Sequence, residues 1–166
     1  MESRAKVLGH PVHQMLIPIP AGLFIVAAVL DIVDTFVDAA WISTVTYWNI
    51  AFGVISALVA AVFGAIDWTK IPRDTRAKRV GAIHGIGNVI AVLFFGCALL
   101  MRSDNAMYAT DSGALALEVI AFLMLGVTAW LGGELVDRMG VGVDDGANLN
   151  APSSLREKHV PTSMHH

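Results

Sequence analysis

Four long apolar runs, separated by short polar segments, dominate the pattern of hydrophobic and polar positions. They cover residues 15–33, 47–66, 80–101 and 114–131. Each is close to the roughly 20 residues that a helix needs to cross the hydrocarbon core of a bilayer. None alternates apolar and polar residues strictly, as the strands of a membrane barrel do. The pattern predicts an all-α fold: an integral membrane four-helix transmembrane bundle with up-down topology.

The flanking residues extend these runs into helices over about residues 12–34, 46–68, 79–102 and 113–138. Residues 1–143 would then form one transmembrane domain. Residues 144–166 are rich in Asp, Asn, Ser and Pro, which predicts a flexible carboxyl-terminal tail. We assign no function to the two histidines that end it, His165 and His166. Pro18 and Pro20 fall inside the first run and are expected to bend or interrupt helix one.

Composition supports a membrane protein and removes several other classes. Hydrophobic residues make up 55% and charged residues 15% of the chain, against roughly 45–50% and 25% in soluble domains. A net charge of −3 gives no indication of nucleic-acid binding. The single cysteine, Cys97, can form neither an internal disulfide nor a cysteine-based metal cage. No phosphate-binding loop, GxSxG elbow or HExxH motif is present, so whether the protein is an enzyme stays open.

The distribution of basic residues predicts the orientation. Arg4 and Lys6 precede the first helix, and the loop after it contains Asp34 and Asp38 but no basic residue. Basic residues remain on the cytoplasmic side of membrane proteins. We therefore expect both termini and the central loop in the cytoplasm. The central loop carries five basic residues: Lys70, Arg73, Arg76, Lys78 and Arg79.

Ionisable groups within membrane helices are costly and indicate functional sites. Here most of them fall at the cytoplasmic ends of the helices. This shallow tier comprises His10, His13, Asp67, His84, Asn88 and Glu134. The opposite ends carry Asp31 and Glu118 but no histidine, with Arg102 in the expected loop, and we expect no site there.

Three interpretations of the cytoplasmic tier stay open. In the first it is structural: Asp67 pairs with Lys70, Glu134 pairs with Arg138 and the histidines bond across helices. In the second, His13 and His84 from diagonal helices ligate one haem iron. His10 is then the substitute ligand, and Asn88 shares a helix face with His84.

The third interpretation is a single non-haem metal ion. Its ligands would be His13, His84, Asp67 and Glu134, a mixed nitrogen and oxygen set that zinc, iron and manganese accept. With no second histidine pair, a pair of stacked haems across the membrane is disfavoured. A single centre would exchange electrons on one side or with a quinone in the bilayer.

Residues 9–22 read GHPVHQMLIPIPAG. This opening resembles a widespread bacterial membrane family, domain of unknown function 2231, with the pattern GHPxHPxLxxxPxG. Further matches are Asp67, His84, the WLGGEL motif of residues 130–135 and GVGV at 140–143, so the resemblance covers residues 9–143. Gln14 stands where the family often has proline, which bears on how helix one begins.

The resemblance implies the bacterial inner membrane and redox work, because some similar proteins carry a Rieske-type iron–sulfur domain on the same chain. Such a partner would be a separate protein here, since one cysteine cannot bind a cluster. Our hypothesis is a b-type haem in electron transfer, with a quinone, a Rieske-type protein or another redox protein as partner. The alternatives are a non-haem metal-binding protein and a structural or accessory subunit of a larger membrane complex. A homo-oligomer is compatible with each.

Overall fold

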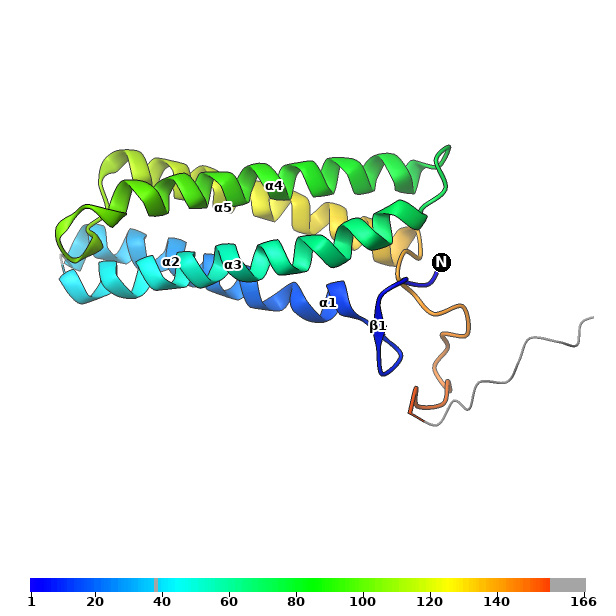
Figure 1. Cartoon of the computed structure of the whole chain (residues 1–166). Helices are drawn as coiled ribbons and strands as arrows, with labels where there is room; N and C mark the ends of the chain where they lie inside the picture. Colours follow the sequence, from blue (N-terminus) through cyan, green and yellow to red (C-terminus); the bar gives the residue numbers. More distant parts are fainter. Residues whose placement is uncertain (38, 156–166) are drawn as a thin grey trace, which may run out of the picture.

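The four expected membrane spans lie side by side in one bundle and run in alternating directions (Figure 1). The computed structural model describes residues 1–37 and 39–155; Asp38 and residues 156–166, with His165 and His166, lie outside it. Within the described residues, four spans are long and apolar enough to cross a membrane: Val12–Val37, Trp41–Lys70, Arg76–Ser103 and Ala106–Arg138. The prediction of an all-α four-helix transmembrane bundle is confirmed.

The spans consist of α1 (Val12–Leu16), α2 (Pro18–Val37), α3 (Ala40–Lys70), α4 (Arg76–Ser103) and α5 (Ser112–Gly133). A π-helical turn, η2 (Glu134–Arg138), continues α5, and a 3-10 turn, η1 (Ala106–Tyr108), lies between α4 and α5. Two short strands, β1 (Lys6–Val7) and β2 (His10–Pro11), pair antiparallel before α1. Helix α3 begins six residues before its expected start, at Ala40 instead of residue 46.

Helix one is interrupted at Ile17, as Pro18 and Pro20 predict. The break is only one residue long, because Pro18 opens α2, a position where its missing N–H is tolerated. Backbone hydrogen bonds from Ile17 N to His13 O and from Ala21 N to Ile17 O bridge the two pieces. Helices α1 and α2 therefore act as one membrane span.

The centre of the bundle is an aromatic pair. The rings of Phe24 on α2 and Phe95 on α4 stack with centroids 4.1 Å apart, and both side chains are buried. Fully buried Ala27, Ile50, Ala91 and Ala121 complete this core. Large apolar side chains on the outer faces are exposed, as expected where lipid is the solvent.

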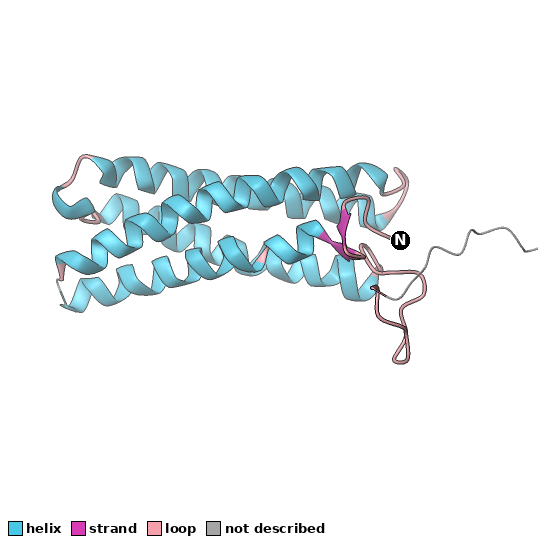
Figure 2. Ribbon diagram, turned by 60° about the horizontal axis from the view of Figure 1, so that its bottom comes forward, coloured by secondary structure: helices cyan, strands magenta, loops and turns pink. Residues whose placement is uncertain are grey.

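The amino-terminal segment and the described part of the tail meet at one end of the bundle (Figures 1 and 2). Gly142 N donates to Met1 O at 2.8 Å, and Ser154 Oγ donates to Leu8 O at 2.9 Å. Lys6 Nζ lies 3.4 Å from Asp144 Oδ2. The Gly146 N–H, with Lys6, lowers the pKa of Asp144. Flexibility of the tail stays a prediction.

The two helical hairpins, residues 12–70 and 76–138, repeat one pattern of inward positions. In the first helix of each, equivalent residues are 71 apart: Phe24 matches Phe95 and Ala27 matches Ala98 (95 minus 24, 98 minus 27), and all four are buried. In the second helix of each the spacing is 68. There buried Gly53 matches Ala121, and buried Ala60 matches Thr128. The hairpins point the same way, so they are parallel repeats rather than inverted ones.

Candidate functional site

His13 on α1 is fixed against α3. Its Nδ1 lies 2.8 Å from the carbonyl oxygen of Ala60. A carbonyl oxygen only accepts hydrogen bonds, so Nδ1 carries the proton and Nε2 keeps its lone pair. The ring packs on Gly64, where an added Cβ would lie 2.7 Å from His13 Cε1. Gly64 therefore provides the space that the imidazole occupies.

His84 on α4 repeats this arrangement against α5. Its Nδ1 lies 2.8 Å from the carbonyl oxygen of Thr128, and a Cβ on Gly132 would lie 3.2 Å from its Cε1. His84 follows His13 by the 71 residues that relate the first helices. Thr128 and Gly132 follow Ala60 and Gly64 by the 68 residues that relate the second helices. Both imidazoles are thus held in the same tautomer by equivalent contacts.

The two imidazoles occupy equivalent positions in the two hairpins, each bonded to the second helix of its own hairpin. They differ in the partner of Nε2. Asn88, one turn after His84, places its amide nitrogen 3.1 Å from His84 Nε2, and its Oδ1 accepts a hydrogen bond from Thr128 Oγ1 at 2.9 Å. The equivalent residue in the first hairpin is Ile17, which has no polar side-chain atom. The pair therefore joins two matched rings in unequal surroundings.

Asp67 holds the amino-terminal segment in place. Its carboxylate accepts hydrogen bonds from Ser3 Oγ, at 2.8 and 2.7 Å, and from Arg4 N at 2.8 Å. Among the described residues Ala5 N, at 3.5 Å, is its other partner, and these contacts replace the expected one with Lys70. Glu134 pairs with Arg76 at 3.0 Å and with Arg138 at 3.8 Å, so its expected pairing with Arg138 is confirmed.

His10 lies outside the bundle on β2, exposed, with Nε2 3.4 Å from Ser154 Oγ. Within the described residues, no group of three or more His, Cys, Asp or Glu side chains is arranged to hold a metal ion. The structure thus brings Asn88 to His84 and gives His13 the equivalent position in the other hairpin, whereas Asp67 and Glu134 bind other partners. The non-haem metal ion stays a prediction without support from this geometry.

The opposite end of the bundle, where no site was expected, carries a buried ion cluster. Arg102 lies inside α4, not in a loop, and is fully buried. It donates from Nη1 and Nη2 to Asp31, from Nη1 to Glu118 Oε1 at 2.9 Å, from Nη2 to Ser43 O at 3.1 Å and from Nε to Tyr108 O at 3.1 Å. All five guanidinium N–H groups are therefore paired.

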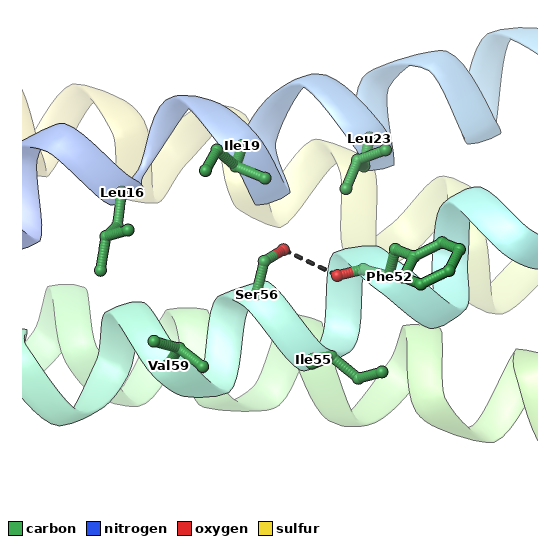
Figure 3. Close-up of a pocket in the computed structure, with 7 residues that line it drawn as sticks. All are labelled: Leu16, Ile19, Leu23, Phe52, Ile55, Ser56 and Val59. Carbon is green, nitrogen blue, oxygen red and sulfur yellow. Dashed lines mark hydrogen bonds between the residues drawn. The ribbon is translucent and has the colours of Figure 1, made fainter.

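A groove on the outer face lies between the first span and α3 (Figure 3). It has a volume of about 330 Å³. Six of its seven lining residues are apolar, and Ser56 Oγ donates to its own helix, to Phe52 O at 2.7 Å. The groove offers no free polar group for catalysis. It is lined by Leu16, Ile19, Leu23, Phe52, Ile55, Ser56 and Val59.

Comparison with known proteins gives one match. The family described as "Predicted membrane protein (DUF2231)" matches residues 9–145, most of the chain. No curated protein matches, and no solved structure matches. The chain belongs to the DUF2231 family of predicted membrane proteins.

Proposed function

We propose that this membrane protein binds one b-type haem through His13 and His84 and serves in electron transfer. The observation that carries the proposal is the matched pair of Nδ1–H···O=C hydrogen bonds, each 2.8 Å long, to Ala60 and Thr128. A histidine that ligates a metal commonly donates its other ring N–H to a carbonyl or carboxylate, which sets its tautomer and raises its basicity. Both rings have this second bond.

The surroundings of the two rings support the proposal that both would hold the iron. Gly64 and Gly132 leave room for the imidazoles at the helix surfaces, and the rings come from the two halves of the repeat. In this proposal His84 Nε2 would exchange its contact with the Asn88 amide for the iron. Asn88 Nδ2 keeps a second acceptor, His84 O at 2.9 Å, and its Oδ1 keeps the hydrogen bond from Thr128 Oγ1. His13 Nε2 has no equivalent amide to displace.

Charge at this end of the bundle also supports the proposal. Haem propionates are negative. The end of α3, the loop after it and the start of α4 together carry five basic residues, from Lys70 to Arg79. Arg76 is 59% exposed at its side chain, so its pairing with Glu134 can be exchanged for another carboxylate at little cost. Electrons would pass to a quinone in the bilayer or to a separate redox protein at the cytoplasmic face.

The first test is the visible absorption spectrum of protein expressed with ample haem. We expect a Soret band in the wild type and its loss in His13→Ala and His84→Ala, because each variant removes one axial ligand. His10→Ala is the matched control and should keep the band, since His10 lies outside the bundle. A wild-type protein without a Soret band rejects the haem. If His13→Ala and His84→Ala also leave function unchanged, the accessory-subunit interpretation gains support.

We also propose that the protein lies in the bacterial inner membrane with both termini in the cytoplasm. The five basic residues from Lys70 to Arg79, at the end of α3, in the loop and at the start of α4, support this because basic residues stay on the cytoplasmic side.

The orientation predicts which loop is accessible from outside the cell. In a Cys97→Ala background, a membrane-impermeant maleimide applied to intact cells should label Asp104→Cys, beyond the end of α4. It should not label Asp74→Cys, between α3 and α4, until the cells are opened. The reverse pattern contradicts the orientation.

A further inference from the structure

The ion cluster at the far end contains more acid than base. Arg102 and Glu118 are 0% exposed and Asp31 is 1% exposed. With both carboxyl groups ionised, the cluster would hold one uncompensated negative charge inside a membrane-spanning segment, where unpaired charge is costly. We propose that Asp31, Arg102 and Glu118 form a proton-binding site, in which Glu118 carries a proton on Oε2.

The hydrogen bonds distinguish the two carboxyl groups. Both oxygens of Asp31 accept from the guanidinium of Arg102, a bidentate pairing that stabilises an ionised carboxylate. Glu118 accepts through Oε1 alone, and its Oε2 is buried without a partner. A proton on Oε2 turns this unpaired acceptor into a donor, beside an Asp31 carboxylate that binds the same guanidinium. The cluster then has no net charge.

No second cation is available to replace the proton. Arg102 is the only Lys or Arg between residues 80 and 137, and residues 7–69 contain none. Asp34 of α2 accepts hydrogen bonds from Ala39 N and Ser43 Oγ, and Asp111 caps α5 at Ala114 N. The other ionisable groups described at this end are Asp104, Tyr47 and Tyr108. All of these are acidic or neutral.

A second unpaired group supports a site that binds a ligand. Thr46 lies three residues after Ser43, whose carbonyl accepts from Arg102, so the two share a face of α3. Thr46 is fully buried and its Oγ1 also lacks a partner. Polar atoms without partners are rare inside proteins, and more so in lipid. Among the described residues the far end has three such atoms, on Glu118, Thr46 and Thr110.

The proton exchanges with the aqueous phase beyond η1. Toward the histidine end, the stacked Phe24 and Phe95 rings and fully buried Ala98 separate the cluster from water. On the other side, Tyr108 turns its carbonyl to Arg102 Nε. Met107 and Tyr108 have φ of 53° and 60°, a conformation that costs energy in residues other than glycine. In this proposal the turn is the element that opens to let the proton exchange.

Infrared spectroscopy of the full-length protein tests the proposal, in a detergent without ester carbonyls. The wild type should show the C=O stretch of a protonated carboxyl at neutral pH. Glu118→Gln keeps the size and neutral charge of the protonated side chain, so it should fold and lose the band. Asp31→Asn should lose it as well, because Glu118 then becomes the only counter-ion of Arg102 and ionises. Glu134→Gln, in the same span but paired with arginines, is the control and should keep the band.

Two results overturn the proposal. One is a wild-type spectrum without a protonated carboxyl at neutral pH, which needs no variant to fold. The other is a band that persists in Glu118→Gln. The site is independent of the haem proposal because it lies at the other end of the bundle, so either can fail alone.

Discussion

Replacing Arg102 by methionine is expected to destabilise the protein by about 3–5 kcal/mol. That is the usual cost of removing one partner from a buried ion pair, because the other charge is left uncompensated. Arg102 lies on α4 and bonds to each of the other three spans, through Asp31 on α2, Ser43 on α3 and Glu118 on α5. Its loss therefore loosens one whole end of the bundle. The measurement is thermal unfolding in mild detergent, followed by circular dichroism.

Two further variants separate charge from packing. Arg138→Met removes an arginine whose side chain is 76% exposed, so the effect should stay within about 0.5 kcal/mol. A triple variant with Arg102→Met, Asp31→Leu and Glu118→Leu should recover much of the lost stability, since apolar replacement of a whole buried ion cluster is often neutral or stabilising. An Arg102→Met protein as stable as wild type would contradict the buried cluster.

Gly64→Leu is expected to remove haem binding without changing a ligand. Even a Cβ at Gly64 would lie 2.7 Å from His13 Cε1, so a leucine must displace the imidazole from its bond to Ala60 O. Overpacking of this kind costs about 1–3 kcal/mol. We expect Gly64→Leu to lose the Soret band, as His13→Ala is expected to do. The absorption spectrum and the unfolding midpoint are measured together.

Helix α5 offers a matched control, Gly133, and a position of intermediate effect, Gly132. Gly133 has no atom within 4 Å of an added Cβ, so Gly133→Leu should keep the band. Gly132→Ala, at 3.2 Å from His84 Cε1, should have an intermediate effect. If Gly64→Leu and Gly133→Leu give the same spectrum, the packing of His13 on Gly64 does not matter for binding.

Hydropathy predicted the helices well because each membrane span must be apolar over nearly its whole length. Depth along the helices also singled out His13, His84 and Asn88, whose role as a cofactor site stays a prediction. Their position depends on distance from the helix end, which is a local property. The pairing of Glu134 with Arg138 was predictable for the same reason, since the two residues are one turn apart.

The contacts that sequence reasoning missed are all long-range. Asp67 bonds to Ser3, 64 residues away, and no local pattern indicates that the amino-terminal segment folds back on α3. Arg102 ends the expected helix 79–102 and was assigned to the loop side because it follows an apolar run. Its side chain instead lies inside the bundle, where it pairs with Asp31 and Glu118. The spacing of 71 residues between Asp31 and Arg102, shared by His13 and His84, was the available signal.

The repeat explains why the two ends of the bundle differ. At the histidine end, equivalent positions carry the same residue, which suits a centre bound symmetrically by two imidazoles. At the far end, equivalent positions carry opposite charges, Asp31 and Arg102, which bind each other. Glu118 has no acidic counterpart, because Ile50 occupies the equivalent position. Its unmatched charge is the reason for the proposed proton.

Titration of the purified, haem-free protein with haemin tests the central claim most directly. The account predicts saturation at one haem per chain, with a Soret shift that is lost in His13→Ala and His84→Ala and kept in His10→Ala. Binding that does not saturate, or that is the same in wild type and both ligand variants, would contradict it.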